Sequence, residues 1–254
     1  IISLESSDSL MSWSDPAVNM SWINNLTGFI ITTKVSGETW EGARVYKTTN
    51  AGNNWSRLPI PVYDAGIYLQ FVDANNGWIL LFNSGFTNGG IFRTTNGGTN
   101  WFQINTVVGG FPYFINSNTG WLLPTNPGSV STADTIRKTT NGGVNWIVQN
   151  TTTNYLSAQG WYDNAVVVKP GDPNYVIVGG LDVFTSTNSG VTLTKVSGWS
   201  TSNTSIFTHA DIHYFAYNGS TLYCLSDGGI YKSTNHGTSW TDLNAKISTL
   251  QYQS

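Results

Sequence analysis

Three side chains that ligate metals or transfer protons alternate in the stretch HADIH at residues 209–213. On a β-strand His209, Asp211 and His213 would share one face, because successive side chains point to opposite sides of a strand. Imidazole and carboxylate groups bind transition metals and act as general acids and bases. The simpler interpretation is that they line a solvent-filled opening and satisfy one another. We keep them as candidate binding residues and predict no metal.

Other catalytic constellations are not visible in the spacing. Glycoside hydrolysis needs two carboxylates separated by roughly 5–10 Å across the scissile bond. The chain has 14 acidic residues, and its three glutamates, Glu5, Glu38 and Glu41, all lie within the first 41 positions. No pair can be nominated from them, and Asp227 in SDGG is typical of a turn. We assign no catalytic residue and leave an acid–base role of Asp227 open.

A ten-residue phrase recurs at a nearly fixed period. It reads YKTTNAGNNW at 46–55, FRTTNGGTNW at 92–101, RKTTNGGVNW at 137–146 and YKSTNHGTSW at 231–240, with a diverged copy, FTSTNSGVTL, at 184–193. The central asparagines, Asn50, Asn96, Asn141, Asn188 and Asn235, are 46, 45, 47 and 47 residues apart. A period of about 20–50 residues is typical of a repeat architecture.

The phrase has the chemistry of a tight turn that closes a β-hairpin. The asparagine oxygen can accept backbone N–H bonds, the glycine two positions later tolerates positive φ, and the final tryptophan can bury its ring against the hairpin. We assign this structural role to the five asparagines, to Gly52, Gly98, Gly143, Gly190 and Gly237, and to Trp55, Trp101, Trp146 and Trp240. The fourth copy has Leu193 in place of the tryptophan.

Each period contains four short β-rich segments joined by Asn, Gly, Asp and Pro turns, without a long helical pattern. Four strands in about 46 residues is the pattern of a β-propeller blade. We predict an all-β chain that forms one β-propeller region, 1–254, as part of a larger propeller. The expected blades are 1–58, 59–104, 105–149, 150–196 and 197–243, and 244–254 is expected to start a further blade or to close the propeller.

The phrase resembles the Asp-box, or BNR repeat, of sialidases, sortilin-like receptors and secreted bacterial propellers, with asparagine where that family usually has aspartate. The stretch 73–101 also resembles photosystem-assembly propellers, and 166–190 with 209–244 resemble secreted Bacteroidetes-type BNR-repeat proteins related to xyloglucanase-like glycosidases. In the Asp-box family the repeat is a structural hairpin away from the active site. The resemblance therefore implies a fold and no particular activity. A sialidase also needs converging arginines, whereas Arg93 and Arg137 precede repeated turns.

The amino-acid composition argues against a nucleic-acid-binding protein and against a membrane-spanning segment. Charged residues make up 10% of the chain, the net charge is −3, and the 11 lysines and arginines form no cluster of the kind that binds nucleic acid. No segment approaches the roughly 18 continuous apolar residues of a membrane span. The single cysteine, Cys224, lies in an alternating apolar run and is expected to be buried and inert.

We expect a non-catalytic, secreted or cell-surface bacterial propeller that acts as an interaction or structural module without a cofactor. Its partner would be another protein or a surface glycan, with no nucleic acid and no membrane insertion. The alternative is a glycoside hydrolase or glycan-binding propeller fragment. Two tryptophans without a place in the repeat, Trp161 and Trp199, are candidate binding residues, because exposed tryptophan stacks on sugars and anchors protein partners.

Overall fold

The computed structural model describes residues 17–36, 39–83, 88–105, 110–123, 135–157, 159–160 and 162–246. The chain separates into two compact units. Unit 1 comprises Ile1–Val108, Asn116–Thr119 and Thr140–Asn145, and unit 2 comprises Gly109–Ile115, Gly120–Thr139 and Trp146–Ser254. Each unit has buried apolar clusters of its own.

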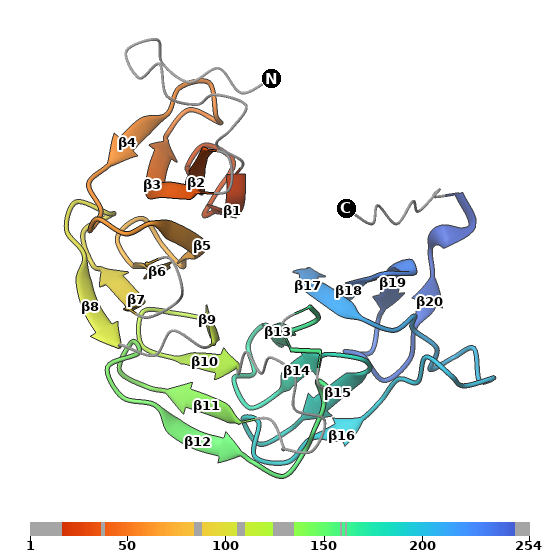
Figure 1. Ribbon diagram of the computed structural model, residues 1–254. Helices are drawn as coiled ribbons and strands as arrows, with labels where there is room; N and C mark the ends of the chain where they lie inside the picture. The colour runs from red at the N-terminus through yellow and green to blue at the C-terminus, as the bar shows by residue number, and fades with distance from the viewer. Residues whose placement is uncertain are drawn as a thin grey trace. The chain divides into compact units, whose positions relative to one another are not determined.

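Unit 1 contains two four-stranded antiparallel sheets whose strands lie side by side in chain order (Figure 1). The first sheet consists of β1 (Ala17–Trp22), β2 (Gly28–Ser36), β3 (Thr39–Thr48) and β4 (Ser56–Leu58). The second consists of β5 (Ala65–Phe71), β6 (Gly77–Phe82), β7 (Gly89–Thr94) and β8 (Phe102–Asn105). The repeated turn connects the third and fourth strands of each sheet.

Unit 2 contains three sheets of the same kind. They are β9 (Phe111–Phe114), β10 (Gly120–Leu123), β11 (Ile136–Thr139) and β12 (Ile147–Asn150); β13 (Ala165–Val168), β14 (Val176–Gly179), β15 (Val183–Ser186) and β16 (Thr194–Lys195); and β17 (Ile212–Asn218), β18 (Thr221–Ser226), β19 (Gly229–Ser233) and β20 (Thr241–Asp242). A 3-10 helix, η1 (Asn244–Lys246), follows the last strand.

The predicted fold class is confirmed. The chain is all-β, and the five four-stranded antiparallel sheets among the described residues are blades of a β-propeller. Among the described residues, no helix is long and apolar enough to cross a membrane.

The second strand of a blade is buried along its whole length in β6, β10 and β14. A strand covered on both faces is apolar at every position instead of alternating. In unit 1 the rings of Phe29 on β2 and Phe71 on β5 stack with centroids 3.5 Å apart. Ser21 Oγ accepts the N–H of Phe71 at 3.0 Å and donates to its carbonyl at 3.3 Å. The blades of this unit are therefore joined by both apolar and polar contacts.

Side-chain oxygens organise the repeated turn. Thr94 Oγ1 donates to Asn96 Oδ1 at 3.0 Å and accepts the N–H of Gly98 at 2.9 Å. Asn96 Oδ1 also accepts the N–H of Asn100 at 2.9 Å. The same three bonds recur in the turns of Asn50, Asn188 and Asn235. The predicted acceptor role of the turn asparagine is confirmed at these positions.

The residue between the asparagine and the glycine of the turn has a left-handed backbone. It is not a glycine in three copies, where φ is 59° at Ala51, 65° at Ser189 and 57° at His236. The N–H of Ala51 donates to the carbonyl of Leu26 at 2.9 Å, and that of Ser189 donates to Asn174 at 2.8 Å. The strained conformation thus joins the turn to the loop that precedes the second strand of the same blade.

The carbonyl of this left-handed residue accepts a hydrogen bond from an aromatic side chain. In unit 1 Trp78 Nε1–H donates to Gly142 at 3.0 Å, and in unit 2 Trp121 Nε1–H donates to Ser189 at 2.9 Å. The Arg93 guanidinium lies 5.6 Å from the Trp78 ring centroid, a cation–π contact. Arg93 therefore has a packing role.

The turn tryptophans pack on the first strand of their own blade. The Trp101 ring meets the Phe71 ring edge-on at 6.0 Å, and its Nε1–H donates to the carbonyl of Gly98 at 3.1 Å. Trp55 donates to Gly52 in the same way at 3.1 Å. These contacts give the tryptophan both an apolar and a polar role in the turn.

We expect Trp101→Ala to lower the free energy of unfolding by roughly 3 kcal/mol, near the lower end for large aromatic deletions because the side chain is half-buried. Chemical denaturation measures this change. Phe102→Ala is the matched control, because its ring is 46% exposed, and it should change stability by less than about 1 kcal/mol. Equal effects of the two substitutions would contradict the packing role of the tryptophan.

We expect Asn96→Asp to change stability by less than about 0.5 kcal/mol near pH 7, because a carboxylate oxygen accepts the same bonds. Thr94→Val should cost roughly 1–3 kcal/mol, because the buried N–H of Gly98 loses its acceptor. Urea titration of both variants separates the two effects. A large loss in Asn96→Asp would mean that the asparagine N–H₂ group is required.

Candidate functional site

Three carboxyl groups and three other polar side chains meet in unit 2. These side chains come from the loop between β12 and β13, from the start of β17 and from the β18–β19 turn. They are Gln159, Tyr162, Asp163, Asp211, His213 and Asp227. We call this group the carboxylate cluster. It is assembled by turns and loops on a scaffold of packed strands, which is where binding residues are common in folded domains.

Asp227 is the best-bonded acid of the carboxylate cluster. His213 Nε2 lies 2.6 Å from its Oδ1. The Tyr162 hydroxyl donates to both carboxylate oxygens, at 3.1 Å and 3.0 Å. The Tyr162 and His213 rings also meet edge-on, with centroids 4.9 Å apart. These contacts hold the Asp227 carboxylate in one orientation beside two exposed rings.

Asp211 has a strained backbone and a crowded carboxylate. Its φ is 63°, in the left-handed region, and its carbonyl accepts the N–H of Asp227 at 3.3 Å. Gln159 Nε2 donates to its Oδ1 at 3.1 Å. Partial burial raises the pKa of Asp211, and the negative charge of Asp227 adds to the rise. The position is stabilised by its neighbours, because a left-handed non-glycine residue is unfavourable by itself.

Asp163 is fully buried. Neither of its carboxylate oxygens accepts a hydrogen bond from a described donor. Burial raises the pKa of Asp163 to about 8, and the charge of Asp211 adds to the rise. The group therefore carries a proton at neutral pH, and the protonated oxygen can donate to the Asp211 carboxylate.

The three acids of the carboxylate cluster differ in exposure. A general acid must reach the leaving group, and Asp163 has no exposed surface. Asp211 and Asp227 supply negative charge nearer the surface, and Tyr162 is 39% exposed beside them. Within the described ranges, no group of three or more His, Cys, Asp or Glu residues could hold a metal ion.

The predicted alternation of HADIH along one strand is wrong for two of its residues. Strand β17 begins at Ile212, so His209 and Asp211 precede it, and only His213 lies on the strand. The reason is the left-handed turn at Asp211, followed by a register shift between Ile212 and Tyr214. The folded chain still brings Asp211 and His213 to the same carboxylate cluster.

The structure describes only one of the two tryptophans that were candidate binding residues. Trp161 lies outside the described residues. Trp199 follows β16, is 48% exposed, and donates its backbone N–H to Asp182 at 3.0 Å. No described contact joins Trp199 to the carboxylate cluster.

Sequence reasoning missed Asp163, Tyr162 and Gln159. Nothing in the YDN stretch at 162–164 distinguishes it from an ordinary polar loop, and its partners lie about 50–65 residues away in sequence. Asp227 lies in the predicted turn between β18 and β19 and also belongs to the carboxylate cluster. Cys224 is fully buried as predicted, and burial raises its pKa.

Comparison with known proteins supports the fold. No protein-family model and no curated protein matches the chain. A structure of YCF48 bound to D1 peptide aligns over 90% of this chain and 67% of its own, with 16% identity and a TM-score of 0.58. The GH74 enzyme of Niastella koreensis aligns over 88% of this chain, with 14% identity and a TM-score of 0.52.

A chain from a nidogen–laminin complex aligns over 90% of this chain and 80% of its own, with 7% identity and a TM-score of 0.59. All three are β-propellers. The chain spans about half the length of the GH74 enzyme, 46%. At these identities the likeness establishes a β-propeller fold and leaves the activity open.

We expect the stability conferred by the protonated Asp163 to be lost as pH rises from about 4 to about 8, because its pKa is higher in the folded than in the unfolded state. Asp163→Asn removes this loss, since an amide stays neutral. The free energy of unfolding of Asp163→Asn, minus that of the parent, should therefore rise with pH, by at most about 1.4 kcal/mol per pH unit. Thermal melts from pH 4 to pH 9 measure it.

The control for this measurement is Asp172→Asn, which removes a half-buried turn carboxylate from the same unit. A pH-independent difference between Asp163→Asn and the parent would show that Asp163 is ionised in the folded protein.

Proposed function

We propose that the chain is a non-catalytic binding module for another protein and that the carboxylate cluster is its contact surface. The observation that carries the proposal is the position of two carboxylates, Asp211 and Asp227, beside exposed aromatic rings. Tyr162, whose hydroxyl donates to Asp227, is 39% exposed, and the ring of His213, which also contacts Asp227, is exposed. Acidic groups next to aromatic faces suit a cationic side chain, which gains both an ion pair and a cation–π contact.

The surface also has an apolar component. Tyr214 on β17 is the register partner of Leu225 on β18, and Leu225 is 37% exposed. Exposed aromatic and aliphatic side chains beside charged groups are typical of the centre of a protein interface. The partner expected from this chemistry presents lysine or arginine next to an apolar side chain.

Two of the structural relatives are recorded with protein ligands, namely YCF48 with D1 peptide and the nidogen–laminin complex. This likeness supports a protein partner in preference to a glycan. The proposal includes membership of the Asp-box, or BNR-repeat, group, which rests on the repeated turn, and a secreted or cell-surface location, which rests on the low charge. Cell fractionation with an antibody against the chain tests the location.

A glycoside hydrolase is the second candidate, favoured by the likeness to a GH74 enzyme and by carboxyl groups of raised pKa. The full burial of Asp163 weighs against a hydrolase, because a substrate cannot reach the proton on this carboxyl group and the proton cannot be transferred to a leaving group. We therefore place binding before hydrolysis.

The probe for the proposed function is a blocked peptide of alternating lysine and glycine. At low ionic strength we expect saturable binding that shifts the NMR signals of Tyr162 and His213. Asp227→Asn should weaken it about tenfold or more, because one of the two carboxylates proposed to pair with lysine is lost. Asp172→Asn should leave the affinity unchanged, and thermal melts confirm that each variant is folded.

Two outcomes contradict the proposed function. One is peptide affinity that Asp227→Asn does not change. The other is turnover of a β-glucan or a sialoside that Asp211→Asn abolishes, which would assign the carboxylate cluster to an enzyme.

A further inference from the structure

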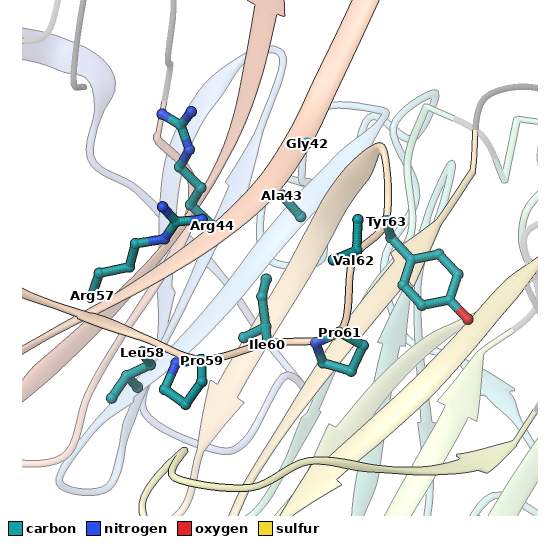
Figure 2. Close-up of a pocket in the computed structure, with 10 residues that line it drawn as sticks. All are labelled: Gly42, Ala43, Arg44, Arg57, Leu58, Pro59, Ile60, Pro61, Val62 and Tyr63. Atoms are coloured by element: carbon teal, nitrogen blue, oxygen red, sulfur yellow. The ribbon is translucent and has the colours of Figure 1, made fainter. Parts of the chain in front are cut away.

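Unit 1 has a groove of about 480 Å³ between strands β3 and β4 and the connection that leads to β5 (Figure 2). The connection leaves the sheet at Pro59 and Pro61, because proline has no N–H to continue strand pairing. The backbone N–H of Ala43 donates to the carbonyl of Tyr63 at 3.0 Å and fixes the far end of the connection against β3. The groove is therefore a formed feature of the blade edge.

Two arginines line this groove. Arg57 on β4 is the register partner of Tyr46 on β3, and Arg44 lies two residues before Tyr46, so the three side chains share one face of the sheet. Figure 2 shows both arginine side chains on the same side of the groove, away from Tyr63. Arg57 forms no ion pair and donates no hydrogen bond to any residue that the structure describes. Its guanidinium is thus available to a ligand.

The other wall of the groove is aliphatic. Val62 is 97% exposed, and Ile60 and Pro61 adjoin it. The Tyr63 ring points away from the arginines in Figure 2 and packs on Phe92 at a centroid distance of 5.3 Å. Sugar rings are usually bound by exposed aromatic faces, whereas this wall suits the aliphatic side chain of a peptide.

We propose that the groove binds an extended peptide segment in which a carboxylate side chain neighbours an aliphatic one. The guanidinium of Arg57 pairs with the carboxylate in the planar, two-bond geometry that arginine favours. The neighbouring aliphatic side chain covers Val62, which removes apolar surface of both partners from water. A volume of about 480 Å³ lies within the usual range for ligand sites. This surface is opposite in charge to the carboxylate cluster and independent of it.

The probe is a blocked hexapeptide of alternating glutamate and valine, and its counterpart has glutamine at the glutamate positions. We expect saturable shifts of the Arg57 Nε–H and Val62 methyl NMR signals with the glutamate peptide. Arg57→Gln and the glutamine peptide should each weaken binding about tenfold or more, the loss of one charge-assisted bidentate contact. Val62→Asn should weaken it as well, because the apolar contact is lost.

Arg137→Gln in unit 2 is the control for the change in charge, and it should leave the affinity unchanged. Asp227→Asn should also leave it unchanged, so that the failure of this proposal and the failure of the proposed function can be told apart. Absence of binding, or binding that Arg57→Gln does not weaken, overturns the proposal. Tighter binding of a tetragalacturonate than of the glutamate peptide would overturn the assignment to a peptide.

Discussion

The hydroxyl and amide oxygens inside the repeated turn take the place of backbone partners that a tight reversal leaves unsatisfied. Thr94 and Asn96 show the arrangement, since each accepts a backbone N–H from the following residues. With these bonds made, the next residue can stay left-handed in spite of its side chain, as Ser189 does. Its N–H then bonds to a loop of its own blade, and its carbonyl receives Trp121 Nε1–H. A local turn thus fixes contacts between segments far apart in the chain.

The hydrogen bonds between tryptophan side chains and the repeated turns also explain the positions of some of the few lysine and arginine residues. Arg93 and Lys138 cover the rings of Trp78 and Trp121, whose N–H groups bond to repeated turns. A chain with only 11 lysines and arginines therefore uses several of them as packing groups. Arg57 differs, because it lies in the groove without a described partner. This contrast is the reason to regard it as a binding residue.

The carboxylate cluster is unfavourable to the fold by itself. A buried Asp163 without a donor and a left-handed Asp211 each oppose folding unless the surroundings compensate. The proton held by Asp163 removes one charge, and Tyr162 and His213 hold the Asp227 carboxylate. Backbone strain and shifted pKa values gathered at one place are more common at functional sites than elsewhere. The packed apolar core of the neighbouring strands supports this arrangement.

The sequence by itself determined what depends on neighbours within a few residues. The bonds of Asn96 span two to four residues, so the repeated turn, its period and the four strands of each blade could be predicted from the order of residues. Only the tertiary structure decided the carboxylate cluster, because Tyr162 and Asp227 are 65 residues apart. The tertiary structure also places His209 and Asp211 before β17 and not on it, because the pattern of polar residues does not reveal the left-handed φ of Asp211. Burial and charge at a site depend on distant segments, which a single repeat does not specify.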